Sequence, residues 1–375
     1  MSRRLTAVAA VLLTIVGSAT LTTPARADSV RNHQWHLDFL RISDAHRIST
    51  GLGVTVAVID SGVADHTDLS GSILHGKDFV SPGGDGQADV DGHGTGMAGI
   101  IAAHGKDGSG ALGIAPDAKI LPVRVASTGS FKRDLAPAIL WSVNHGADVI
   151  NISIGGGISA ATLNALETAA RANVVVIASA GNRPEASGVT APAFVPSVVA
   201  VGAVARTGER ASVSVTGPAL DLMAPGTDIL TTRPNNQYGT GTGTSDAAAI
   251  VSGVAALIRS RFPRLTAHEV VARMESTAID EGDSGVDPEY GHGVINVVAA
   301  LSANSSVPPD QSSGPPPSIE NTSRADNHAV PNSSAPGKSS LLFVSTTVLA
   351  LLIGTIAFFS LRRRRGSDEH RSMER

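Results

Sequence analysis

The sequence predicts an α/β fold, namely a three-layer sandwich with a mainly parallel central sheet, followed by one C-terminal transmembrane helix. Short runs of β-branched and aliphatic residues alternate with stretches of helical length between residues 54 and 301. Aromatic residues make up only 3% of the chain and hydrophobic residues 42%, so the core is expected to be aliphatic. A run without any charge lies at residues 341–361, close to the end of the chain.

Four continuous apolar runs, each bounded by Gly, Asp or Pro, have the length and composition of buried strands. They are residues 54–59, 119–125, 147–153 and 174–179. Residues 133–145 and 160–172 have helical length and lie between strands, which predicts right-handed βαβ units. Ligand sites of such sheets form beyond the carboxyl ends of the strands, and Asp60 directly follows the first strand.

Composition excludes several classes of function. The chain of 375 residues contains no cysteine, so disulfides, thiolate metal sites and thiol redox chemistry are excluded. A formal net charge of -4 is too small to indicate a nucleic-acid partner. A chain of this length can bury a sizeable core without cross-links.

Residues 1–27 have the features of a signal peptide. Arg3 and Arg4 precede an apolar run at residues 5–16, and residues 25–27 (Ala-Arg-Ala) give a small-x-small cleavage pattern. The run is shorter than the roughly 20 residues of a membrane span, although a retained N-terminal anchor is the alternative. Residues 28–50 are then expected to form an N-terminal extension ahead of a folded domain at residues 51–301.

The C-terminal part predicts a tethered membrane anchor. Residues 302–340 are rich in Pro and Ser, which is typical of a flexible tether. At about 1.5 Å per residue, a helix over residues 341–361 would span a bilayer, and a buried core helix is the less favoured alternative. Four arginines open the basic tail at residues 362–375, which the positive-inside rule places in the cytoplasm. The folded domain is then expected on the extracytoplasmic side of the cell membrane.

Three distant segments offer the groups needed for nucleophilic cleavage of a peptide bond. Asp60 lies in the segment Asp-Ser-Gly, His93 in Asp-Gly-His-Gly-Thr-Gly, and Ser245 in Gly-Thr-Gly-Thr-Ser. A serine hydroxyl becomes a good nucleophile when an imidazole takes its proton, and a carboxylate fixes the imidazole tautomer. The order Asp, His, Ser along the chain is one of the three known orders of this triad.

Two of these residues are expected at the starts of helices. His93 precedes a run of small and aliphatic residues that continues to Ala103, and Ser245 precedes a helix through Arg259. A helix start offers free N–H groups and a partial positive charge to a developing oxyanion. In the alternative interpretation, Thr244 or Ser245 simply caps the helix.

A second oxyanion donor is expected from Asn182. It follows the strand at residues 174–179 in the segment Ala-Gly-Asn, so its amide can point into a cleft at the carboxyl edge of the sheet. A structural role for an Asn in a Gly-containing turn is the alternative.

These segments resemble the subtilisin-like serine proteases over residues 51–300. The resemblance implies that Asp60 orients His93, that His93 acts as general base and acid, that Ser245 attacks, and that Asn182 completes the oxyanion hole. It also implies two substrate-binding segments that pair with the backbone of an extended peptide. The residues concerned are Ser127, Thr128 and Gly129 on one side, and Ser153, Ile154, Gly155 and Gly156 on the other.

The order of segments along the whole chain resembles a narrower group, the mycosins, which are membrane-anchored proteases associated with type VII secretion. These share a signal peptide, a protease domain, a proline-rich tether, one C-terminal span and a basic tail. Residues 31–38 also resemble the start of the mature mycosin chain. The resemblance implies polypeptide substrates, membrane attachment and a place beside components of the secretion channel, with processing of exported proteins as the role.

The run after Ser245 departs from the subtilisin-like pattern. Asp246 stands where that family has a large residue, and Ala249 stands where it has proline. A carboxylate beside the nucleophile favours the helix dipole and is expected to raise the pKa of His93 or to repel the oxyanion. Two alternatives therefore stay open, a catalytically weak structural subunit of a secretion complex and a tethered general degradative protease.

No metal or other cofactor is predicted. The histidines do not form a paired zinc-binding spacing such as His-Glu-x-x-His. Asp85, Asp89 and Asp91 lie in a Gly-rich loop, which is compatible with structural calcium but lacks the spacing of a dedicated calcium loop. A solvated acidic turn is the preferred interpretation of these three residues.

Overall fold

The computed structural model describes residues 27–105, 109–127, 134–155 and 157–303. The chain divides into two units, residues 1–309 and 310–375, and the second unit lies wholly outside the described residues. The same holds for residues 1–26, for almost all of the expected tether, and for the expected span and basic tail. Among the described helices, none is long and apolar enough to cross a membrane.

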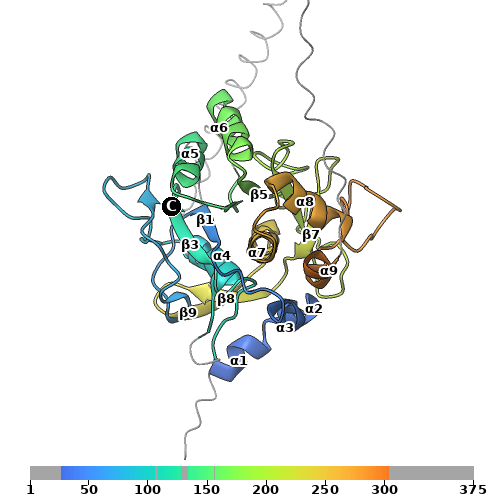
Figure 1. Ribbon diagram of the computed structural model, residues 1–375, viewed down its shortest axis with the longest axis horizontal. Helices are drawn as coiled ribbons and strands as arrows, with labels where there is room; N and C mark the ends of the chain where they lie inside the picture. Colours follow the sequence, from blue (N-terminus) through green and yellow to red (C-terminus); the bar gives the residue numbers. More distant parts are fainter. Residues whose placement is uncertain (1–26, 106–108, 128–133, 156, 304–375) are drawn as a thin grey trace, which may run out of the picture. The chain divides into compact units, whose positions relative to one another are not determined.

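The centre of the described domain is a parallel sheet of seven strands (Figure 1). Its order, β2-β3-β1-β4-β5-β6-β7, confirms an α/β fold in which β1 lies near the middle. The strands are β1 (Thr55–Asp60), β2 (Lys77–Asp78), β3 (Lys119–Arg124), β4 (Val149–Ile152), β5 (Val175–Ser179), β6 (Val199–Val204) and β7 (Leu222–Pro225). The four strands expected from the sequence are β1, β3, β4 and β5, each shifted by no more than two residues at either end.

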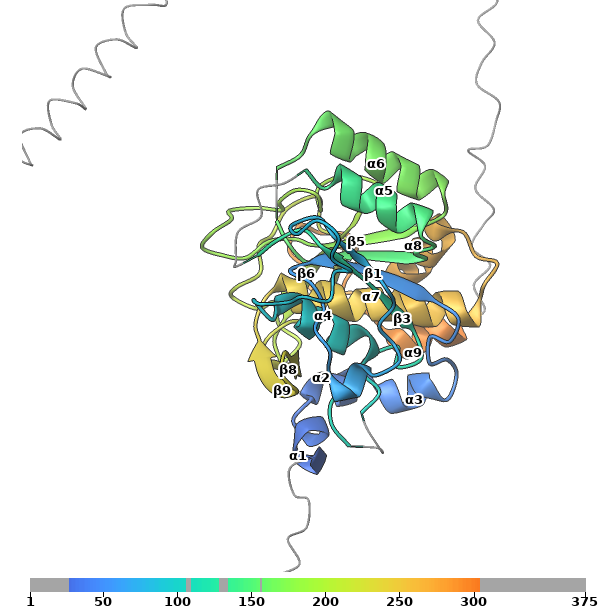
Figure 2. The ribbon, with the colours of Figure 1, turned by 90° about the vertical axis from the view of Figure 1, so that its left-hand side faces the viewer.

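Helices cover both faces of the sheet, as the continuous burial of the strands requires. Alternate residues of β1 face opposite layers: Val56 and Val58 belong to one core cluster, whereas Ala57 and Ile59 belong to the other. Figure 2 shows one layer of helices on one side of the sheet and a second layer on the other side. The first layer is α5 (Ala136–Asn144) and α6 (Ala160–Arg171), and the second is α4 (His93–Ala102), α7 (Thr244–Arg261), α8 (Ala267–Ser276) and α9 (Val297–Ser302).

The helix expected at residues 133–145 begins at Ala136. Pro137 lacks an N–H group and fits only the first turn, which places the helix start just before it. The Asp134 carboxylate accepts a hydrogen bond from the Ala136 N–H and thereby satisfies one free donor of that turn.

The N-terminal extension is folded against the domain. Its helices are α1 (Ala27–Asn32), α2 (Trp35–Phe39) and α3 (Ile42–His46). Leu37, Leu40 and Ile42 are buried in the main core cluster. The Gln34 amide donates to the carbonyl oxygens of Leu112 and Leu230, at 3.0 and 3.2 Å. The hydrogen bond to Leu230 fastens the extension to the base of a separate hairpin, and α3 lies against α9.

That hairpin, β8 (Ile229–Arg233) and β9 (Gln237–Gly241), is antiparallel and leads directly into the segment of Ser245. β8 lies against α4: Thr231 Oγ1 donates to the Gly96 carbonyl and Thr232 Oγ1 to the Thr95 carbonyl, both at 2.8 Å. A Cβ at Gly99 would lie 2.1 Å from Thr232 Oγ1, so this packing requires glycine there. The hairpin therefore joins the helix of His93 to the turn of Ser245.

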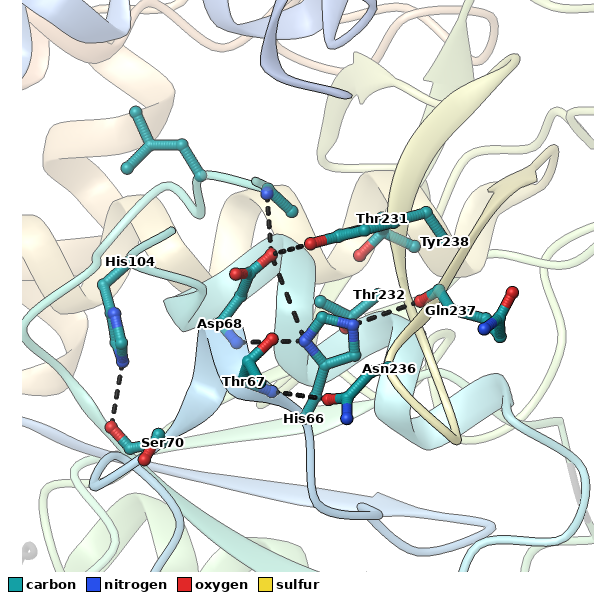
Figure 3. A network of polar contacts seen from close by, with 12 residues as sticks. His66, Thr67, Asp68, Ser70, His104, Thr231, Thr232, Asn236, Gln237 and Tyr238 are labelled. Carbon is teal, nitrogen blue, oxygen red and sulfur yellow. Dashed lines mark hydrogen bonds and ion pairs between the residues drawn. The ribbon is translucent and has the colours of Figure 1, made fainter. Parts of the chain in front are cut away.

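A buried polar cluster also ties the hairpin to the loop after β1 (Figure 3). Nδ1 of His66 accepts from the Asp68 N–H at 3.0 Å, so Nε2 carries the proton and donates to the Gln237 carbonyl at 3.1 Å. The Asp68 carboxylate accepts from the Tyr238 hydroxyl and from the Ala111 N–H, both at 2.8 Å. The segment that follows Asp60 is thus held against the segment that precedes Ser245.

Replacing Tyr238 with phenylalanine removes the hydroxyl donor to the buried Asp68 carboxylate. We expect the free energy of unfolding to fall by about 1.5–3 kcal/mol, the range for losing a hydrogen bond to a charged group. Chemical denaturation of the purified protein measures this change. Gln237→Ala is the matched control, since His66 bonds to its main-chain carbonyl, and an equal loss in that variant would contradict the explanation.

Candidate active site

Asp60 is the last residue of β1 and is completely buried at the carboxyl edge of the sheet. Its Oδ1 accepts from the Ser61 N–H at 2.7 Å and lies 2.8 Å from Nδ1 of His93. A carboxylate only accepts hydrogen bonds, so Nδ1 is the donor and Nε2 is the nitrogen left to accept a proton. Oδ2 of Asp60 is buried without a hydrogen-bond partner among the described residues, so much of its charge acts on the imidazole.

His93 is the first residue of α4, and its side chain is one-third exposed. The helix starts very close to β1, because a Cβ at Gly94 would lie 2.1 Å from the Gly62 carbonyl oxygen. Only glycine allows this approach, which explains why a glycine follows the histidine.

Asp89 accepts hydrogen bonds at the start of α4. Its position corrects the interpretation of the loop with Asp85, Asp89 and Asp91 as a solvated acidic turn. Its carboxylate accepts from the Gly92 N–H at 2.8 Å, from the Thr95 N–H at 2.9 Å and from the Ser61 hydroxyl at 2.9 Å. The side chain is buried, so the expectation of a solvated acidic turn is wrong for Asp89, whose oxygens are already bound by the protein. Asp91 is exposed, and Asp85 accepts from the Gln87 N–H. In the described part of the chain, no three His, Asp or Glu residues are grouped to hold a metal.

Ser245 is the second residue of α7, and a buried polar network holds its main chain. The Ser153 hydroxyl donates to the Ser245 carbonyl at 3.0 Å. Asn151 joins the two elements, since its Nδ2 donates to the Ser153 hydroxyl and its Oδ1 accepts from the Ser252 hydroxyl, both at 3.0 Å. The end of β4 therefore fixes the helix start that carries the serine.

Asn182 and Ser245 face the same small space. Oδ1 of Asn182 accepts from the Thr244 N–H at 2.9 Å and from the Thr244 hydroxyl at 3.1 Å, which leaves Nδ2 as the end of the amide directed at this space. A Cβ at Gly243 would lie 3.1 Å from Nδ2 of Asn182 and 3.2 Å from Oγ of Ser245. An oxyanion formed on a carbonyl attacked by Ser245 would have a donor there.

The capping interpretation of Thr244 and Ser245 is wrong. Gly243 is the N-cap of α7, and neither the Thr244 nor the Ser245 side chain accepts a hydrogen bond from the first N–H groups of this helix. The Thr244 hydroxyl instead accepts from the Gly181 N–H at 3.1 Å and donates to Asn182. It therefore orients the Asn182 amide, whose Oδ1 takes up the Thr244 N–H, and leaves the Ser245 N–H available.

The electrostatics of the site favour a charged imidazole. The negative charge of Asp60, its hydrogen bond and the charges of Asp246 and Asp91 outweigh desolvation and raise the pKa of His93 to about 9. Burial raises the pKa of Asp246 to about 6, against the opposing charges of His93 and Arg233. Among the hydrogen bonds of the described residues, none joins Ser245 Oγ to the His93 ring. This contact is often long in unliganded sites and tightens when substrate binds.

The two expected substrate segments leave the sheet on either side of Asp60. Ser127 follows β3, and residues 153–155 follow β4, the two neighbours of β1. The Ser153 side chain is turned inward toward α7, so only its main chain can pair with a peptide. Thr128, Gly129 and Gly156 lie outside the described residues. Pairing of these segments with a substrate stays a prediction.

Some residues that support the site were missed by the sequence reasoning. They are Asp89, Asn151, Ser252 and, in its role as an orienting residue, Thr244. An acidic residue shortly before a helix start is a capping signal that could have found Asp89. The three others act through contacts that only the folded chain creates.

A parallel α/β sheet with an Asp–His pair, a serine at a helix start and an amide donor defines the class of serine hydrolases. The subtilase family matches residues 51–293, and the chain belongs to this family. It is a subtilisin-like serine endopeptidase that acts on polypeptide substrates.

The curated relatives include subtilisins of Bacillus species. The chain is 42% identical to subtilisin E of Bacillus subtilis (strain 168) over 258 residues, which cover 67% of this chain and 66% of that protein. It is 40% identical to subtilisin DY of Bacillus licheniformis, with 67% of this chain and 91% of that protein covered.

Solved structures of mycosins have the same fold. MycP1 from Mycobacterium smegmatis aligns with a TM-score of 0.67 and 32% identity over 76% of this chain and 87% of its own. The MycP3 protease from the type VII (ESX-3) secretion system aligns with a TM-score of 0.62 and 33% identity over 72% and 88%.

Replacing Gly243 with alanine places a methyl group between Asn182 Nδ2 and Ser245 Oγ. The backbone of Gly243 is extended, with φ 170°, so alanine fits without backbone strain. We expect kcat for a peptide substrate to fall on the order of 10²-fold, the scale of losing one oxyanion donor in subtilisin. The midpoint of thermal unfolding should change little.

Gly188→Ala is the matched control, because its Cβ would meet only the Thr216 carbonyl oxygen at an ordinary 3.7 Å. Wild-type kcat in Gly243→Ala would contradict the assignment of this space to the oxyanion.

The raised pKa of His93 predicts activity on the alkaline side of neutrality. Below this pKa the ring is protonated and cannot accept the serine proton, so kcat/KM should rise with pH toward about 9. A pH profile of kcat/KM in the free enzyme measures the midpoint directly. An ascending limb centred at or below the unperturbed value of about 6.5 would contradict this electrostatic account.

Proposed function

We propose that this protein is a membrane-anchored, extracytoplasmic serine endopeptidase of the mycosin type, which processes substrates of type VII secretion with the triad Asp60, His93 and Ser245. The observations that carry the catalytic part are the Asp60–His93 hydrogen bond of 2.8 Å and the space shared by Ser245 Oγ and Asn182 Nδ2.

In the proposed reaction, Ser245 Oγ attacks the carbonyl carbon of the scissile bond while His93 Nε2 takes the hydroxyl proton. The carbonyl π electrons move to oxygen, and this oxyanion accepts hydrogen bonds from Asn182 Nδ2 and the Ser245 N–H. When the tetrahedral intermediate collapses, His93 returns the proton to the leaving amine and an acyl-enzyme remains. A water molecule, deprotonated by the same nitrogen, then releases the acid product and restores the serine.

Binding of an extended peptide would use main-chain groups of the segments after β3 and β4. These segments flank Asp60 at the same edge of the sheet, and Ser153 in the second segment bonds the Ser245 carbonyl, so a strand lying between them would pass close to Ser245. Such pairing recognises an extended backbone, and side-chain preference would come from the surrounding pockets.

The proposed secretion role and cellular location are supported by the two ends of the sequence and by one similar solved structure. The ends of the sequence have the pattern of a signal peptide, a tether, an apolar span and a basic tail. One similar structure, with a TM-score of 0.66, is described as MycP1, a serine protease that is an essential component of the type VII (ESX-1) secretion system. We infer from this likeness that the chain works beside a secretion channel at the cell membrane.

A second candidate function is a catalytically weak subunit that stabilises the secretion complex. The buried, partly unpaired carboxylate of Asp246 beside the nucleophile is the observation that favours it. A tethered degradative protease is the remaining alternative, and it differs in specificity rather than in chemistry.

A fluorophosphonate probe tests the catalytic proposal in the full-length protein in membranes. We expect covalent labelling of the wild type on Ser245 and at least a 10²-fold slower reaction in Ser245→Ala and His93→Ala, because both changes remove the activated nucleophile. Ser43→Ala, on the N-terminal extension, is the control and should label normally. Absence of labelling in correctly folded wild type would favour the structural subunit.

A further inference from the structure

Asp246 directly follows the nucleophile Ser245 in the sequence, and one oxygen of its buried carboxylate is left without a hydrogen bond in the described part of the chain. The side chain is only 3% exposed, and Oδ1 has no hydrogen-bond partner among the described residues. A buried carboxylate with an unpaired oxygen destabilises the fold, so its presence beside Ser245 calls for a reason.

The backbone around Asp246 is shaped to hold the carboxylate in place. A Cβ at Gly241 would lie 2.4 Å from Oδ1 and 2.9 Å from Oδ2, so the carboxylate lies flat against the end of β9. Gly241 is two residues before Gly243, whose Cα faces Asn182 Nδ2 and Ser245 Oγ. The Asp246 carboxylate therefore lies next to Gly241, and the oxyanion space lies next to Gly243 in the same segment.

Two cationic groups lie within electrostatic range of Asp246: His93 from α4 and Arg233 from β8. Arg233 is engaged elsewhere, because its guanidinium donates to the Gly92 carbonyl at 3.4 Å and the Thr240 carbonyl at 3.3 Å. The His93 ring in turn experiences the charges of Asp60 from β1, Asp91 from the preceding loop and Asp246 from α7.

We propose that the buried Asp246 carboxylate is a second anionic partner of the His93 ring, which acts through its charge to stabilise the imidazolium formed while Ser245 is acylated. This inference rests on the proposed function of the same site. Asp60 fixes the tautomer by a hydrogen bond at Nδ1, whereas Asp246 acts over a distance without touching the ring. It is not a catalytic residue in the strict sense, because it touches neither substrate nor nucleophile oxygen.

The proposal has a distinctive kinetic signature in Asp246→Asn, which keeps the shape and removes the charge. Below the pKa of His93, the imidazole ring is positively charged in the free enzyme and in the transition state. Removing the Asp246 charge then raises the free energy of both states equally, and kcat/KM does not change. Above this pKa, only the transition state has a charged ring, so removing the Asp246 charge lowers kcat/KM. We therefore expect coinciding kcat/KM curves at acid pH, a midpoint lowered by about one unit and an alkaline plateau lowered by up to about tenfold.

Asp91→Asn is the matched control, because Asp91 also acts on His93 by charge but is exposed. Salt screens exposed charges far more than buried ones. The midpoint shift in Asp91→Asn should be smaller and should vanish in about 1 M salt, whereas the shift in Asp246→Asn should persist.

The second readout is the titration of His93 itself, followed by NMR in Ser245→Ala with and without Asp246→Asn. It needs no activity, so it separates failure of this proposal from failure of the proposed function, and thermal unfolding checks that both variants are folded. A downward shift in the His93 midpoint on loss of Asp246, retained in high salt, supports the proposal. An unchanged midpoint, or a shift no larger or more salt-resistant than that of Asp91→Asn, overturns it. A kcat/KM curve lowered equally at every pH would also overturn it, since that indicates a structural role.

Discussion

The close approach of the α4 start to the end of β1 is the constraint on which the site depends. Asp60 ends the strand, His93 begins the helix, and their hydrogen bond forms only because Gly94 lets the two backbones meet. Asp89 reinforces the junction by bonding both the helix start and the Ser61 hydroxyl. A side chain at position 94 would separate acid and imidazole even though both residues were still present.

Ser245, the third residue of the triad, is positioned by hydrogen bonds of the hairpin that precedes it. The hairpin β8–β9 lies on α4 and is tied to the loop after β1 by the cluster of His66, Asp68 and Tyr238. The hairpin then leads the chain to Gly243 and Ser245, while Ser153, which directly follows β4, donates a hydrogen bond to the Ser245 carbonyl. Hydrogen bonds between neutral groups, together with the buried Asp68 carboxylate, thus position Ser245, which comes from a distant part of the chain.

Much of this arrangement could be predicted from the sequence. β1, β3, β4 and β5 are continuous buried runs, and such runs between helical stretches indicate a parallel sheet. Asp60, His93, Ser245 and Asn182 stand in short glycine-containing segments at the ends of predicted strands or the starts of helices, where sheet topology brings them to one edge. β6 and β7 were not assigned, since the first contains Gly202 and the second is short and ends in a proline.

The supporting contacts could not be predicted, because they depend on which polar groups become buried together. Asp89 was interpreted as part of a solvated turn, yet folding buries it at a helix start whose donors it satisfies. Capping of α7 by Thr244 or Ser245 was the alternative interpretation, whereas the Thr244 side chain in fact orients Asn182. The isolation of the Asp246 carboxylate likewise appears only when Gly241 is packed against it.

A crystal structure of the protein with a peptide boronate tests the central claim most directly, because the boronate forms a tetrahedral adduct with an activated serine. The account predicts a bond from boron to Ser245 Oγ, one boronate oxygen within hydrogen-bonding distance of Asn182 Nδ2 and the Ser245 N–H, and His93 Nε2 beside the other. A peptide bound in the groove with Ser245 Oγ unreacted and turned away from the His93 ring would contradict it.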